Sequence, residues 1–177
     1  MNRYLFTLAT LMVLLSGCAS SVTKDIMVET NSDPKANLAG YKSYSWLGSA
    51  AIVFDEKGRW EPPQFDADAE IKFLIDRELR DRGMTENSVN ADLIVAYAAG
   101  INMDSMNIKI DPESGLEQLA DAPIGALSVI LVDAVTGQAV WIGVASADIQ
   151  ENRTPETSRK RLAYAVSEMF HGLPHTH

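Results

Sequence analysis

Apolar residues are spaced differently in successive parts of the chain, and each spacing predicts a different element. Leu5 to Leu15 is an almost unbroken apolar run. In contrast, Tyr44 and Trp46 alternate with two serines, which is the pattern of a half-buried strand within residues 41–47. Shorter apolar groups, such as the one that begins at Ile26, are typical of the start of a strand.

Two segments have the apolar spacing of a helix. From residue 67 to 82 the apolar side chains recur every three or four positions with charges between them, and Asp66 or Asp68 can cap the first turn. The second segment, residues 155–170, begins after a capping threonine and has proline in its first helical position.

The remaining apolar segments predict strands. Residues 93–98 form a short apolar strand, and residues 101–110 a more polar one in which a bulge or a loop breaks the alternation. Residues 126–132 are apolar on both faces, which favours a central strand, and with 139–149 they make the clearest hairpin. The loop at 111–125 has the length of segments that are usually functional or mobile.

The order of these elements indicates the fold class. Strands and helices follow one another as β-β-α-β-β-β-β-α. This order predicts an α+β fold with a single, mostly antiparallel sheet and two helices packed on one face.

The N-terminal apolar run has the features of a bacterial lipoprotein signal. It follows one cation, Arg3, and its roughly 11 residues are too few to span a hydrocarbon core of about 30 Å. Leu15, Ser16 and Gly17 then precede Cys18, in the manner of a lipobox. The alternative is an ordinary secretory signal, but Cys18 is the only cysteine, so no disulfide can use its thiol and acylation would consume it.

The signal divides the chain into four parts. Residues 1–17 are a cleaved signal peptide, 18–24 a lipidated cysteine with a short tether, 25–174 a single α+β domain, and 175–177 a C-terminal tail. Ala19 is not the aspartate typical of inner-membrane retention. The sequence therefore predicts a protein anchored by lipid in the inner leaflet of the outer membrane, facing the periplasm.

Charge argues against nucleic acid as a partner. The chain carries 15 Lys and Arg against 24 Asp and Glu, a net charge of −9, and losing Arg3 with the signal makes it one unit more negative. Phosphate binding needs clustered cations. The one cationic run, residues 159–161, lies in a predicted helix and is interpreted as a solvated helix face.

Three segments resemble one known family. Residues 33–46, 91–97 and 132–143 are similar to the domain of unknown function 4136 (DUF4136) lipoproteins. The resemblance covers nearly the whole mature chain and implies an exported envelope lipoprotein, but it implies no activity, ligand or catalytic residue.

The recurring residues of these segments have structural explanations. Trp141 would fill a small core, while Gly137 and Gly143 suit a turn and close packing. Asp92 before a strand and Asp133 before a turn can accept hydrogen bonds from backbone amides nearby.

The sequence offers little that would support catalysis or metal binding. His171, His175 and His177 are weak candidate ligands for zinc or copper, but Gly172 and Pro174 interrupt the helix that would align them. The soluble part has no cysteine nucleophile and no nucleophile elbow. We therefore expect no catalytic residue, no resident metal, and no cofactor beyond the lipid on the cysteine.

Two functional hypotheses follow. The first is a non-enzymatic envelope protein that binds an envelope protein or the cell wall through one sheet face or the 111–125 loop, with Trp60, Tyr97 and Met106 as contacts if they are exposed. The second is a periplasmic carrier or sensor of a small apolar or lipid-like ligand held between sheet and helices.

Overall fold

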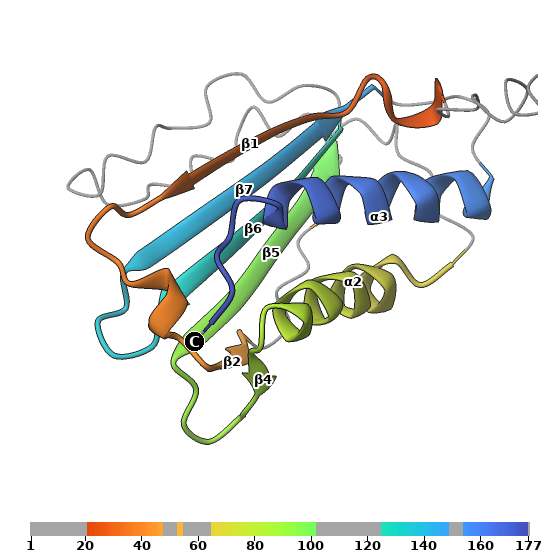
Figure 1. Cartoon of the computed structure of the whole chain (residues 1–177). Helices are drawn as coiled ribbons and strands as arrows, with labels where there is room; N and C mark the ends of the chain where they lie inside the picture. Colours follow the sequence, from red (N-terminus) through yellow and green to blue (C-terminus); the bar gives the residue numbers. More distant parts are fainter. Residues whose placement is uncertain (1–20, 48–52, 55–64, 102–124, 149–153, 177) are drawn as a thin grey trace, which may run out of the picture.

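The computed structural model describes residues 21–47, 53–54, 65–101, 125–148 and 154–176. These residues form two α-helices, seven strands and two short 3-10 helices (Figure 1). In chain order they are η2 (Ser21–Thr23), β1 (Met27–Ser32), η3 (Leu38–Gly40), β2 (Ser43–Trp46), β3 (Val53–Phe54), α2 (Ala67–Asp81), β4 (Thr85–Glu86), β5 (Leu93–Ile101), β6 (Gly125–Asp133), β7 (Ala139–Ala147) and α3 (Pro155–Phe170).

All seven strands belong to one open sheet of order β1-β7-β6-β5-β2-β4, with β3 also paired to β5. The pairs β1–β7, β7–β6 and β6–β5 are antiparallel. By contrast, β2 runs parallel to β4 and β5, and β3 runs parallel to β5. The sheet is therefore mixed, and the prediction of a mostly antiparallel sheet is wrong. The reason is that α2 connects β2 and β3 to β5, and such a crossover brings in the next strand parallel to the one before it.

Both helices lie in front of the same face of the sheet and run in the same direction (Figure 1). Near their first turns, Arg159 Nε on α3 lies 3.4 Å from Glu70 Oε2 on α2. Near their last turns, the guanidinium of Arg82 lies 5.6 Å from the ring centroid of Phe170. The prediction that both helices cover one face agrees with this arrangement.

Local sequence determines where the helices begin. Asp66 caps α2, since its Oδ1 accepts a hydrogen bond of 3.0 Å from the amide of Ala69. Thr154 caps α3 in the same way, with Oγ1 accepting from the amide of Thr157 at 3.1 Å, and Pro155 follows it.

The core lies between the two helices and the inner face of the sheet. Tyr44 is fully buried, as its alternation with serines predicts. The largest side chains that are almost wholly buried come from both layers; they are Trp141, Tyr44, Phe170, Leu74, Ile75, Leu79, Met84, Leu93, Leu131, Met169, Val95 and Val129. The helix-facing side of the sheet is thus filled by the protein's own residues.

The β6–β7 hairpin is confirmed, with Gly137 at a positive φ of 72° in its turn. Gly143 on β7 faces Met169 of α3. A Cβ on this residue would lie 3.1 Å from Met169 Cβ and 2.5 Å from the ring of Trp141. Gly143 therefore allows the close packing that its sequence context predicts.

Some predicted elements differ from the observed ones. The strand predicted at 93–98 extends to Ile101, and β3 and β4 were not predicted because two-residue strands have no periodicity to detect. Most of the predicted strand at 101–110 and of the 111–125 loop lies outside the described residues. In the part of the chain that the structure covers, neither helix has the length and apolar character needed to cross a membrane.

Candidate functional site

The segment that follows the predicted lipid attachment site is fixed to α3 by Arg161. Nη1 of Arg161 donates to Asp25 Oδ1 at 2.7 Å, and Nη2 donates to Asp25 Oδ2 at 2.6 Å. The same guanidinium also donates to the carbonyl of Val22 in η2 and, at 3.4 Å, to the carbonyl of Asp148. We call these four residues the N-terminal clamp. Because the Arg161–Asp25 pair is bidentate, it fixes the orientation of the chain as well as its position.

The clamp is only partly exposed to solvent, and it is ionised at neutral pH. The side chains of Arg161 and Asp25 are 12% and 25% exposed. The hydrogen bonds from Arg161 lower the pKa of Asp25 from 3.8 to about 2, although partial burial acts in the opposite direction. Leu15, Ser16, Gly17 and Cys18 lie outside the described residues.

Two aspartates, Asp92 and Asp133, bind backbone amides at the other end of the sheet. Asp92 accepts hydrogen bonds from the amides of Lys42 and Ser43, each of 2.9 Å, and these bonds lower its pKa. Asp133 accepts from the amide of Thr136 at 2.7 Å, and its pKa is lowered by that bond above all. Asp133 therefore has the local backbone role that the sequence indicates, whereas Asp92 binds amides of a distant segment instead of its neighbours.

Tyr41 contributes a side-chain hydrogen bond to Asp133. Its hydroxyl donates to Asp133 Oδ2 at 2.9 Å. Burial, followed by that hydrogen bond, raises the pKa of Tyr41 to about 12. The hydroxyl is thus a neutral hydrogen-bond donor at physiological pH.

A second group of aromatic residues lies between the sheet and α2. Asp76 Oδ1 accepts hydrogen bonds from the Tyr44 hydroxyl at 2.8 Å and from Trp46 Nε1 at 3.1 Å. Tyr97 donates its hydroxyl to Asp68, and its ring meets that of Trp46 edge-on at 6.2 Å. These bonds satisfy the polar atoms of buried aromatic rings, so the group stabilises the helix–sheet packing.

Tyr97 is therefore not available as a partner contact. It is 3% exposed, because its position on β5 points it into the helix-covered face. The sequence suggested Tyr97 as a partner contact only if it were exposed, and the structure shows that it is buried. Trp60 and Met106 lie outside the described residues.

The C-terminal segment is attached to α2 by Arg82. Nη1 of Arg82 bonds to Glu78 Oε2 at 2.8 Å, and Nε donates to the carbonyl of Leu173 at 3.2 Å. In return, the carbonyl of Arg82 accepts from the amide of Thr176 at 2.9 Å. We call Arg82, Glu78, Phe170, Leu173 and Thr176 the C-terminal clamp, since Arg82 Nη2 also donates to the carbonyl of Phe170.

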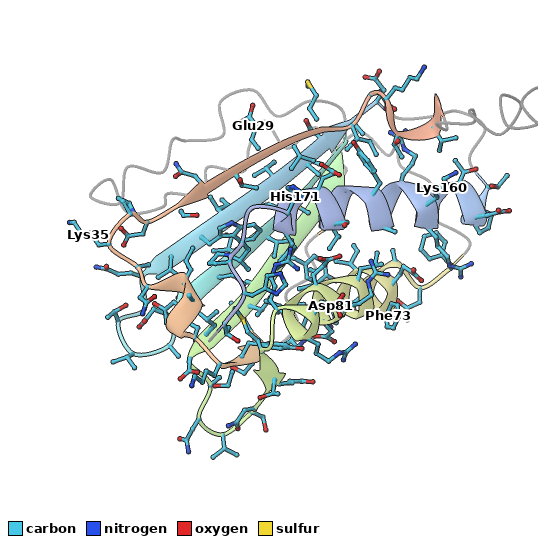
Figure 2. All side chains as sticks on the ribbon, viewed as in Figure 1. Glu29, Lys35, Phe73, Asp81, Lys160 and His171 are labelled. Carbon is cyan, nitrogen blue, oxygen red and sulfur yellow. The ribbon has the colours of Figure 1, made fainter. Side chains whose placement is uncertain are left out.

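The C-terminal histidines do not form a metal centre in the part of the chain described. His171 is the exposed C-cap of α3, and His175 is exposed three residues beyond Gly172 (Figure 2 labels His171). His177 lies outside the described residues. Among the residues that the structure covers, no group of three or more His, Cys, Asp and Glu side chains could hold a metal ion.

The sequence did not identify the two arginines, Arg161 and Arg82, around which the two clamps form. Arg161 was grouped with the solvated cations at 159–161, yet it precedes Ala165 by one helical turn and so lies on the buried stripe of α3. That spacing could have identified it. For Arg82 only the pairing with Glu78, four residues earlier, is local; the carbonyls of Phe170 and Leu173 come from a distant part of the chain.

Comparison with known proteins identifies a family. The family described as a domain of unknown function, DUF4136, matches residues 28–175. No curated protein matches the chain.

Three solved structures match the chain to different degrees. A DUF4136 family protein from Bacteroides thetaiotaomicron has 13% identity and a TM-score of 0.60, with 84% of this chain and 95% of that chain covered. The PelC dodecamer from Paraburkholderia phytofirmans has 15% identity and a TM-score of 0.47, covering 86% and 99%. A minor lipoprotein from Acinetobacter baumannii has 13% identity and a TM-score of 0.32, covering 74% and 91%. At these identities the first likeness shows the fold alone, and the other two, with TM-scores under 0.5, add nothing to that conclusion.

Proposed function

Because this chain belongs to the DUF4136 family, whose function is unknown, we propose a function from its own residues: a non-enzymatic envelope lipoprotein. Lipid on Cys18 holds it in the inner leaflet of the outer membrane, facing the periplasm. There it binds an envelope protein or the cell wall and needs no cofactor beyond that lipid.

The N-terminal clamp is the observation that carries this proposal. Arg161 binds the chain at Val22 and Asp25, only a few residues after Cys18. The mature protein therefore begins at the surface of its folded domain, as expected for a chain cut at Cys18. Ala19 in the following position favours the outer membrane over the inner one.

The environment of the acidic residues supports a role without catalysis. Asp92 and Asp133 are occupied by backbone amides, while Asp68 and Asp76 are occupied by aromatic hydroxyl and indole groups. A general acid or base needs a carboxyl group that can reach a substrate with a suitable pKa. The pKa values of Asp68, Asp92 and Asp133 are all lowered, which makes them poor proton donors at neutral pH.

The packing between sheet and helices gives no support to the carrier alternative. A ligand in that space would have to displace side chains such as Tyr44, Val129 and Phe170, each of which has no exposed surface. Displacing them would cost the packing of the domain. We therefore prefer a partner bound at the surface.

The anchor is tested by intact mass of protein extracted from membranes, with Cys18→Ser as the matched control. We expect wild type to lack residues 1–17, to carry acyl chains, and to follow outer-membrane markers on a sucrose gradient. The control variant should lack the acyl mass. A soluble, unlipidated wild-type protein would show that the proposed anchor is wrong.

The partner is tested separately by crosslinking in native membranes at endogenous levels. We expect a distinct envelope protein or cell-wall fragment in the crosslinked product. Recovery of this chain alone would contradict a heterologous partner without affecting the anchor.

A further inference from the structure

Very little chain separates the proposed lipid from the folded domain. Only residues 19–21 lie between Cys18 and Val22, whose carbonyl is bound by Arg161. We propose that the end of the domain formed by η2, the start of β1 and the first half of α3 rests on the lipid headgroups; this inference depends on the proposed anchor. We call it the membrane end.

The reach of the tether determines which end lies nearest the membrane. At about 3.3–3.6 Å per residue, four steps of extended chain place Val22 no more than about 14 Å from Cys18. If Val22 were released, the Asp25–Arg161 ion pair would still limit the tether to seven steps, about 25 Å. The nine-residue strands β5, β6 and β7 are each about 30 Å long, so the far end of the sheet lies well beyond this reach.

The figures show the two ends clearly. In Figure 1 the red-orange start of the described chain lies at the same end of the sheet as the beginning of α3, while β2, β4 and the C-terminus lie at the opposite end. Figure 2 shows Lys160 near the membrane end and Lys35 at the other extreme of the molecule.

The membrane end presents cationic and apolar side chains that can contact lipid headgroups. Lys24 and Lys160 are both exposed, and they are the sequence neighbours of Asp25 and Arg161, so the clamp holds them close together. Met27, which begins β1, is 63% exposed and offers an apolar side chain to the interface. The lysines have flexible stems that can extend toward phosphate groups.

Charge adds to the orientation but does not determine it alone. Asp25 is neutralised by Arg161, whereas Glu156 in the first turn of α3 and Asp148 in the clamp are exposed and acidic. The tether therefore supplies the main constraint, and the two lysines offset these two acids so that the membrane end is not repelled by headgroup phosphates.

Depth-dependent fluorescence quenching of the full lipidated protein tests the orientation. Cys18 is the only cysteine and is acylated, so Lys160→Cys or Lys35→Cys provides a single site for a maleimide dye. Lys35 is the matched control, since it is also an exposed lysine but lies at the opposite end. The proteins are placed in vesicles of four parts phosphatidylcholine to one part phosphatidylglycerol that contain headgroup-quenching lipid.

We expect the dye at position 160 to be quenched several-fold more than the dye at position 35. Equal quenching in protein that floats with the vesicles would overturn the orientation and leave the anchor intact. Failure to float, with no acyl mass on the protein, would overturn both.

A longer tether tests whether the short tether sets the orientation, or whether the domain simply adheres to the vesicle surface. Insertion of a Gly-Ser linker of about ten residues between Ser20 and Ser21 leaves the clamp and the fold unchanged but frees the domain. We expect the difference between positions 160 and 35 to fall to near equality in vesicles of phosphatidylcholine alone. An undiminished difference there would mean that the tether does not set the orientation.

Discussion

Each end of the chain is held by one arginine, and the two arginines differ in what surrounds them. The side chains of Arg82 and its partner Glu78 are 9% and 10% exposed, and the guanidinium also lies against Phe170. Arg161 is similarly shielded, but its partner Asp25 is 25% exposed. The C-terminal clamp is therefore an extension of the core, whereas the N-terminal clamp lies at the surface, where water can replace part of what it provides.

Because of this difference, we expect the two clamps to have different roles: one in the stability of the fold, the other in the position of the N-terminal segment. Loss of a buried ion-pair partner leaves an uncompensated charge in the interior, while loss of a surface pair leaves groups that water can solvate. We conclude that the C-terminal clamp mainly holds the fold together. The N-terminal clamp mainly determines where the segment that follows the proposed lipid attachment site lies.

The largest expected effect is that of Arg82→Ala. It removes the partner of Glu78 and leaves the carbonyls of Phe170 and Leu173 without their donor, which should cost about 3–5 kcal/mol of unfolding free energy. Urea denaturation measures this loss. Arg80→Ala, an exposed change on the same helix, is the control and should alter stability by no more than about 0.5 kcal/mol. Equal losses in the two variants would contradict the distinction between the clamps.

Gly83→Ala should have the next largest effect, because it affects the C-terminal clamp in two ways. Gly83 has a positive φ of 88°, and a Cβ there would lie 2.5 Å from Thr176 Oγ1. Gly137→Ala is the matched control, since its φ is 72° but its Cβ would meet nothing within 4 Å. Both changes should cost about 1–2 kcal/mol for backbone strain, and Gly83→Ala about 1 kcal/mol more.

The comparison is made by thermal or urea unfolding of the two alanine variants. A larger loss for Gly83→Ala means that the C-terminal segment is firmly packed. Identical losses would indicate that this segment moves aside without cost.

Acid should weaken the N-terminal clamp, as well as the bonds of Asp68, Asp92 and Asp133, whose pKa values are also lowered. The pKa of Asp25 is about 2 in the folded protein and 3.8 when unperturbed, so its contribution is present above about pH 4 and is lost as pH falls toward 2. Since Asp25 is a quarter exposed, we expect at most about 2 kcal/mol from this source. Arg161→Ala removes the cause of the lowered pKa, so the stability gap between wild type and this variant should narrow over that range.

Unfolding free energies of wild type and Arg161→Ala at several pH values provide the measurement. The Asp25→Asn variant, which cannot ionise at this position, serves as the control. Its unfolding free energy should lack the same acid-dependent contribution. A gap that stays constant down to about pH 2 would show that this ion pair does not couple protonation to folding.

The smallest expected effect is that of ending the chain at Pro174. This truncation removes the two hydrogen bonds from Thr176 to the carbonyl of Arg82 and should cost about 1 kcal/mol. The same variant tests the weak metal hypothesis, because it lacks His175 and His177. If calorimetry shows the same zinc binding before and after truncation, the histidine tail is not a metal site.

Local patterns predicted much of this fold because the determinants of each element are close together in sequence. Asp66 and Thr154 cap the helices that follow them, and the alternation around Tyr44 correctly indicated a buried face. The β6–β7 hairpin was predictable for the same reason, since its turn and both strands are contiguous.

Features that depend on distant parts of the chain were not predictable. The parallel pairing of β2 with β5 depends on the path of α2 across the sheet, which periodicity does not encode. Similarly, Arg161 meets Asp25 from the opposite end of the chain, and each residue alone is an ordinary surface charge. At the candidate site, the backbone role of Asp133 was predicted, while that of Asp92 proved to involve the amides of another strand.

The position of β1 has a consequence for the order of folding. β1 is an edge strand near the start of the described chain, yet it pairs with β7, so Met27 meets Ser146 only after nearly the whole chain has been made. Closing so long a loop is slower than forming the β5–β6–β7 meander, whose strands follow one another. We therefore expect the strand that is made first to be the last to join the sheet, so that, under the proposed lipid anchor, the N-terminal segment would still be free when the signal peptide is processed.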